Sequence, residues 1–254
     1  SQMEFSLDHG AGEIAILMCF AAIGGFMRGF AGFGTTLSMV PLFTFVIEPA
    51  PAVLIGMSID AMSTIPLVPR AVKEADWKPV APILIGGLLA TPIGVYILLV
   101  FSADSMRIAI ASMVIISALM MLSGWSYQGR KPFSLSFFVG LLSGTAGTAT
   151  SVGGPPIALY LLAGGTPAKA MRASLNCFSF IKQSFSVLII VLAGGFGLEI
   201  VPPIVFLLPA MLGFTWVGTR IFWCVSDTGF RKFLLYFLIT VGIALMVRTF
   251  YAMS

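Results

Sequence analysis

Long apolar runs separated by short polar loops dominate the hydrophobic pattern of the chain. A helix that crosses the ~30 Å hydrocarbon core of a bilayer needs about 20 residues, with roughly 17 to 25 as the usual range. Apolar runs of about this length recur along almost the whole sequence. The pattern therefore predicts an all-α integral membrane protein with about 10 hydrophobic helical segments, at residues 13–33, 36–47, 51–69, 79–101, 107–124, 133–146, 150–163, 169–193, 199–223 and 230–251.

Three of these segments are short. Residues 36–47, 133–146 and 150–163 would form only about 18 to 21 Å of helix at 1.5 Å per residue, which is less than a comfortable crossing. Non-helical backbone at membrane depth is tolerated only where it is buried in protein or lines a watery cavity. The first two segments of each half are therefore expected to form re-entrant or broken-helix hairpins. Whether the first hairpin crosses fully stays open, because its first arm is longer.

The two halves of the chain share a skeleton. The stretch 25–41 carries glycines at 25, 29 and 32 and ends in Pro41, and the stretch 140–156 repeats these residues 115 positions later. A fixed offset of this kind indicates duplicated structural units. We therefore expect one transmembrane transporter domain over residues 1–254, built from internal repeats 13–124 and 133–251.

Positive charges gather in alternate loops. Arg70, Lys73 and Lys78 follow the third segment, and Arg130 and Lys131 join the two halves. Such loops stay in the cytoplasm, which predicts both termini outside. Each half then makes an odd number of crossings, five or three, so the two five-segment repeats should be inverted relative to each other.

The composition supports a membrane protein and argues against other classes. Of the 254 residues, 58% are hydrophobic and 9% are charged, against roughly 25% charged in a soluble domain. The formal charge of +4 is spread over short loops, which indicates topology rather than a nucleic-acid surface. The three cysteines lack CxxC spacing, and the single histidine is His9 in the polar leader. We expect no metal, no cofactor and no enzymatic activity, because paired acid and base residues are also missing.

The glycine- and hydroxyl-rich breaks are the candidate binding site. Helix N-termini offer free N–H donors and about half a positive charge, so two helices that begin near Thr35 and Thr150 would attract an anion. Hydroxyl groups add donors, and glycines let an oxyanion approach the backbone. Helix packing is the alternative role for Gly25, Gly29, Gly140 and Gly144, whose spacing fits small-xxx-small contacts. The candidate substrate-binding residues are Arg28, Gly32, Gly34, Thr35, Thr36, Thr148, Thr150, Ser151, Gly153, Gly154, Asn176 and Lys182.

Three ionisable side chains, Arg28, Asp60 and Lys182, lie away from the ends of their apolar segments. Each costs at least ~2.5 kcal/mol at the bilayer centre unless it is paired or hydrated. Arg28 and Lys182 could bind an anion, or one of them could form a structural ion pair with Asp60. Asp60 aligns with Asn176, 116 positions later, so the same position is acidic in one half and neutral in the other. This asymmetry makes Asp60 the candidate coupling group for a proton or another cation.

Several motifs together resemble a known family. They are the duplicated glycine-rich element that ends in proline (29–41 and 144–156), the Pro-Ala at 51–52 and 167–168, and the Arg-Ala-Ser at 172–174. Over about residues 13 to 250, the chain resembles the TauE/SafE sulfite exporter family of bacterial membrane permeases. The resemblance implies export of sulfite or of an organosulfonate such as sulfoacetate, and a location in the bacterial inner membrane.

The expected function is export of a small sulfur oxyanion by alternating access, with the anion held between the two helix breaks. Outward movement of one negative charge releases about 2.3 kcal/mol per 100 mV, inside negative, so export needs no coupling. The expected partners are the small anionic substrate, the lipid bilayer and, if Asp60 couples transport, a proton. An anion channel and a proton-coupled permease for another small organic anion remain alternatives, and the oligomeric state is open.

Overall fold

The computed structural model describes residues 11–31, 34–124, 127, 129–162, 167–196, 198–222 and 227–253, and these contain helices but no strand. Every predicted apolar segment contains an α-helix. The all-α fold class is confirmed. The helices are α1 (Ala11–Ala31), α2 (Thr35–Phe43), α3 (Pro49–Thr64), η1 (Ile65–Leu67), α4 (Val68–Glu74), α5 (Trp77–Val100), α6 (Ala103–Leu122), α7 (Phe133–Thr150), α8 (Gly154–Leu162), α9 (Ala168–Leu192), η3 (Leu198–Ile200), α10 (Val201–Phe222) and α11 (Asp227–Met253).

Length separates the helices into two kinds. Among the described residues, 8 helices are long and apolar enough to cross a membrane. The helices α2 and α8 have only 9 residues each, or about 14 Å at 1.5 Å per residue. These two short helices are the second arms of the predicted hairpins, and neither is long enough to cross a bilayer.

The second break lies later in the chain than the sequence predicts. The helix α7 continues through Thr150 and ends at Ser151, which has a left-handed backbone with φ 63°. The helix α8 begins at Gly154, so the expected helix start near Thr150 is wrong. The reason is the Pro155-Pro156 pair, because proline is favoured in the first turn of a helix, where its missing N–H costs nothing.

Prolines also divide the segment predicted at 51–69. The helix α3 ends at Thr64, and the chain continues through η1 and α4 as far as Glu74. Pro66 and Pro69 each stand in the first turn of these short helices. Each proline removes one backbone donor, so the α-helical hydrogen-bond ladder is interrupted although the direction of the chain is kept.

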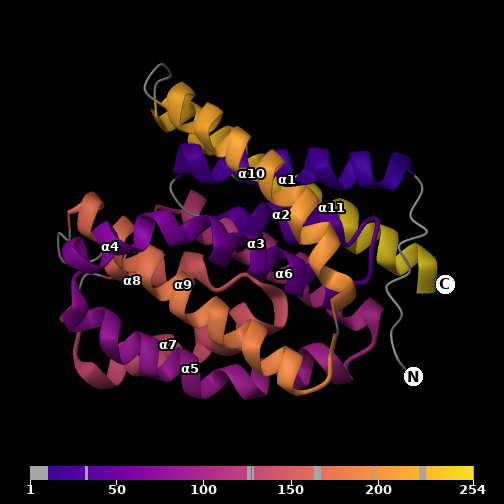
Figure 1. Ribbon diagram of the computed structural model, residues 1–254. Helices are drawn as coiled ribbons and strands as arrows, with labels where there is room; N and C mark the ends of the chain where they lie inside the picture. Colours follow the sequence, from indigo (N-terminus) through magenta and orange to yellow (C-terminus); the bar gives the residue numbers. More distant parts are fainter. Residues whose placement is uncertain are drawn as a thin grey trace.

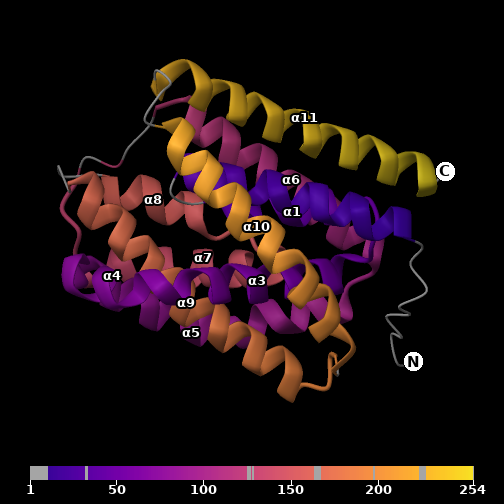
Figure 2. The same ribbon diagram turned by 45° about the horizontal axis from the view of Figure 1, so that its top comes forward.

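Two close helix pairs lie on opposite sides of the molecule. Figures 1 and 2 show α1 beside α10, and Figure 1 shows α5 beside α7 on the other side of the molecule, with α3 between the pairs. A Cβ atom on Gly25 would collide with the carbonyl of Met211, and one on Gly29 with the carbonyl of Thr215. Residue numbers rise together along this interface, so α1 and α10 run parallel.

The α5–α7 pair repeats the same packing. A Cβ on Gly140 would collide with the carbonyl of Ile83, and one on Gly144 would lie 2.6 Å from the backbone of Gly87. The numbers again rise together, so α5 and α7 also run parallel. Only glycine allows backbones to approach this closely, which gives these glycines a packing role.

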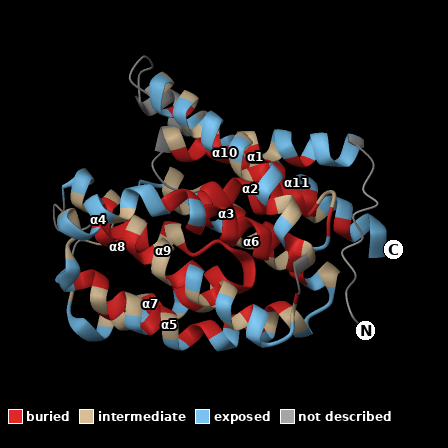
Figure 3. Ribbon diagram, in the orientation of Figure 1, coloured by how far each residue is buried: buried red, intermediate tan, exposed pale blue. Residues whose placement is uncertain are grey.

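The centre of the molecule is formed by α2 and α3. All nine residues of α2 are buried, and in α3 only Met62 is exposed. Figure 3 shows these buried residues at the centre and exposed residues along the outer helices. The exposed residues of α5 and α10 include large apolar ones such as Leu89, Tyr96 and Phe206. Extended apolar surfaces of this kind suit a protein surrounded by lipid.

Candidate functional site

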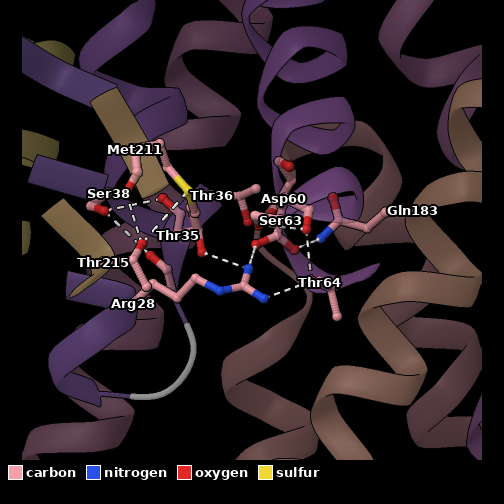
Figure 4. Close-up of polar contacts among 12 residues, drawn as sticks. Arg28, Thr35, Thr36, Ser38, Asp60, Ser63, Thr64, Gln183, Met211 and Thr215 are labelled. Carbon is pink, nitrogen blue, oxygen red and sulfur yellow. Dashed lines mark hydrogen bonds and ion pairs between the residues drawn. The ribbon is translucent and has the colours of Figure 1, made fainter. Parts of the chain in front are cut away.

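An ion pair between α1 and α3 organises one side of the candidate site. The Arg28 guanidinium forms a salt bridge with the Asp60 carboxylate, and both residues are buried, at 7% and 5% exposure. Arg28 also donates to the Thr35 hydroxyl at 3.2 Å and to the Thr64 hydroxyl at 2.6 Å (Figure 4). The carboxylate of Asp60 compensates the charge of Arg28.

The Asp60 carboxylate has donors on both of its oxygens. One oxygen accepts from Arg28, and the other accepts from the Gln183 side-chain amide of α9 (Figure 4). The Thr64 hydroxyl, which receives the Arg28 bond, donates to the Asp60 backbone carbonyl at 2.7 Å. Asp60 therefore links three helices, α1, α3 and α9, through one buried polar network.

The two helix breaks meet beside this network. Gly34, which precedes α2, has φ 93°, a left-handed conformation that glycine adopts without strain. The Thr36 hydroxyl at the start of α2 donates to the Ser151 carbonyl in the second break at 2.7 Å. Thr36 and Ser151 are separated by 115 positions, the same offset that relates the two glycine-rich stretches. The contact therefore joins equivalent residues of the two halves.

A small cavity of about 50 Å³ lies between the breaks, α3 and α9. Ten of the thirteen residues singled out from the sequence line it. They come from five helices and from both breaks, and they are Arg28, Gly34, Thr35, Thr36, Asp60, Ser151, Gly153, Gly154, Asn176 and Lys182.

Lys182 is a buried basic residue in the wall of this cavity. The residue is 3% exposed and lines the cavity from α9. Within the described parts of the chain, its ammonium makes no hydrogen bond or ion pair. A Cβ on Gly147 would lie 3.1 Å from the ammonium nitrogen, so α7 passes close to it. The Asp60 carboxylate attracts the ammonium without touching it, since Arg28 and Gln183 hold its two oxygens. A buried cation without a directly bonded partner is costly.

Two threonines from the sequence prediction point elsewhere, because α7 runs on to Thr150. Thr148 hydrogen-bonds with the Ser186 hydroxyl at 3.2 Å, and Thr150 donates to the Ala146 carbonyl at 2.8 Å. Neither residue lines the cavity. Substrate binding by Thr148 and Thr150 stays a prediction, and the structure does not bring these two residues to the cavity. Gly32 lies outside the described residues.

Sequence reasoning missed Gln183 and Ser179, which also line the cavity. Asn176, Ser179 and Lys182 follow one another at intervals of three residues, and Gln183 lies four residues after Ser179. Intervals of three and four residues bring side chains to one face of a helix. This polar stripe in an otherwise apolar segment was the available signal.

Comparison with known families decides the class of protein. Residues 17–245 match the family described as Sulfite exporter TauE/SafE. The chain belongs to this family. TauE/SafE membership makes the protein a multi-pass membrane transporter rather than an enzyme, and it implies an exporter of sulfite or a related anion. No curated protein and no solved structure matches the chain significantly, so the site must be interpreted from its own geometry.

Proposed function

We propose that this TauE/SafE protein exports sulfite or a similarly small sulfur oxyanion, and that the anion binds in the cavity between the helix breaks. The observation that carries the proposal is the buried Lys182 ammonium, which forms no hydrogen bond or salt bridge within the described residues. An anion in the cavity would supply the missing charge partner. The hydroxyl of Ser151, which is buried and also unpartnered among the described residues, would be an additional donor.

The size of the cavity favours an inorganic oxyanion. A cavity needs roughly 10 to 15 Å³ to hold one water molecule. The cavity of about 50 Å³ therefore has room for about three to five groups of the size of a water molecule. Sulfite has one sulfur and three oxygens. Sulfoacetate adds two carbons and two oxygens to a sulfonate group, and it would need a wider site than this conformation provides.

The second basic residue has a different role in this proposal. Arg28 is held by Asp60, Thr35 and Thr64, so it shapes the cavity wall and contributes little net charge. The Asp60 carboxylate accepts from a guanidinium and from an amide, so donors of the protein already occupy both of its oxygens. We therefore assign Asp60 a positioning role instead of the coupling role that the sequence suggested.

The helix pairs support two inverted repeats. If successive segments of each half alternate in direction, the fourth helix of a half runs opposite to its first. A parallel α1–α10 pair and a parallel α5–α7 pair then require that the halves be inverted. In Figure 1, α4, which carries Arg70 and Lys73, lies at the end of the molecule opposite the start of α1 and the end of α11. This supports termini outside a bacterial inner membrane.

Alternating access in inverted repeats exchanges the conformations of the two halves. In the present conformation the Thr36 hydroxyl donates to the Ser151 carbonyl, while the Ser151 hydroxyl has no partner among the described residues. In the exchanged conformation Ser151 would donate to the Thr36 carbonyl. A direct hydrogen bond between the two breaks, which would exchange its donor and acceptor between states, favours a carrier over a channel.

The test of this function is sulfite flux in proteoliposomes. The voltage is clamped with potassium and valinomycin, and the pH gradient is varied independently. We expect sulfite to leave the negative compartment at a rate that follows the voltage, whereas sulfoacetate should be transported poorly. Protein-dependent flux of neither compound would overturn the proposed substrate, and flux that requires a pH gradient would restore Asp60 as the coupling group.

The glycine that opens α8 provides a further prediction. A Cβ on Gly154 would have no atom within 4 Å, although Gly154 lines the cavity. Gly154→Ala should therefore fold normally while its methyl group occupies substrate space, and we expect sulfite flux to fall about 10-fold or more. Gly213→Ala on the exposed face of α10, where a Cβ also has no neighbour within 4 Å, is the matched control. Equal flux in the two variants would contradict this position for the substrate.

A further inference from the structure

The cavity has a definite balance of charge. Of the described residues that line it, three are ionisable: Arg28 from α1, Asp60 from α3 and Lys182 from α9. The lining residues of α2, α7, α8 and the second break are uncharged. The opposite charges of Arg28 and Asp60 cancel in their salt bridge, so Lys182 leaves the protonated site with one positive charge.

The single positive charge of Lys182 distinguishes a singly charged form of the substrate from a doubly charged form. An uncompensated charge is expensive inside a membrane protein, and a monoanion beside Lys182 makes the loaded site neutral. A dianion would leave one excess negative charge. Lys182 can carry its proton before the anion enters or take it up on entry. In both cases the site that holds a monoanion is neutral.

A hydrogen-bond acceptor in the lining points in the same direction. The Gln183 side-chain oxygen is buried and has no partner among the described residues. Its orientation is fixed, because the amide nitrogen must face the Asp60 carboxylate, which only accepts. An unpaired acceptor suits a ligand with an O–H group better than one whose oxygens all accept.

We propose that the site takes the singly charged, protonated form of the sulfur oxyanion, hydrogensulfite, and excludes the sulfite dianion. This inference rests on the proposed function and specifies its substrate. Each turnover then carries one sulfur, one proton and one net negative charge outward. The proton leaves on the substrate, so no protein side chain has to relay it.

The experiment compares three anions in proteoliposomes with the wild-type protein, at a constant total concentration of sulfur(IV) and at pH values from acidic to alkaline. Chlorate has the pyramidal XO₃ shape of sulfite but is a permanent monoanion. Sulfate is a permanent dianion over the same range. A change in the protonation of Lys182 would alter both the flux of sulfite and the competition by chlorate. A change in the protonation of the substrate would alter only the flux of sulfite.

We expect sulfite flux to fall about tenfold per pH unit once hydrogensulfite loses its proton, while competition by chlorate stays constant and sulfate does not compete. Measured charge movement should be one per sulfur. Sulfite flux that rises with pH, competition by sulfate, or two charges per sulfur would overturn the inference but leave sulfite export intact. Absence of sulfite flux at every pH would instead remove the proposed function, and this inference with it.

Discussion

Lys182→Met should lower sulfite transport by about 100-fold, because a hydrogen bond between the substrate and a charged group typically contributes about 1.5 to 3 kcal/mol. Methionine keeps most of the volume of the side chain and removes only its charge and donors. The same substitution should raise the thermal unfolding temperature of the anion-free protein, since it removes a buried charge that forms no hydrogen bond or salt bridge within the described residues. Flux in proteoliposomes and thermal unfolding in detergent measure the two effects.

Lys169→Met is the matched control on the same helix. The side chain of Lys169 is 66% exposed and pairs with Glu74 at 3.0 Å, and exposed pairs contribute only about 0 to 1 kcal/mol. This variant should transport sulfite normally. A Lys182→Met protein that transports like wild type, or one that unfolds at a clearly lower temperature without substrate, would contradict the role assigned to Lys182.

Breaking the Arg28–Asp60 pair should have the largest effect on stability. Arg28→Met or Asp60→Leu alone leaves one buried charge uncompensated, which is expected to destabilise the protein by about 3 to 5 kcal/mol. The double variant removes both charges and should recover most of that loss. Thermal unfolding of the purified variants, or their yield in the membrane fraction, measures the difference.

The Arg107–Asp104 pair on α6 serves as the control, because its side chains are partly exposed, at 24% and 43%, and lie 3.0 Å apart. Arg107→Met should cost less than about 1 kcal/mol. If the losses of the two single variants simply add in the Arg28→Met/Asp60→Leu protein, the two residues do not act as a coupled pair.

Much of the fold could be predicted from the sequence, because a helix that crosses a membrane needs a long run of apolar residues. The short length of α2 was visible in the same way. The end of α7 could not be predicted in this way, because Thr148 and Thr150 are equally suited to the end of one helix and to the start of the next. The Pro155-Pro156 pair decides the matter by its missing donors, and the break moves to residues 151–153.

The sequence predicted which types of residue form the candidate site, but it did not predict which of these residues contact one another. Two cations and one carboxylate in apolar segments required some pairing, but the sequence could not say whether Arg28 or Lys182 meets Asp60. That choice depends on the packing of α1 against α3, which brings Arg28 to the carboxylate and leaves Lys182 facing the cavity. Gln183 was missed because an amide side chain can both donate and accept, so its residue type gives little indication of its partner.

Equilibrium binding of radiolabelled sulfite to the purified protein tests the central claim most directly, because it requires neither a correct orientation in a vesicle nor a complete transport cycle. We expect the wild-type and Lys169→Met proteins to bind saturably, with one anion per chain. Lys182→Met should show no saturable binding over the same concentration range. Equal binding by Lys182→Met and wild type would contradict an anion site built on the Lys182 ammonium.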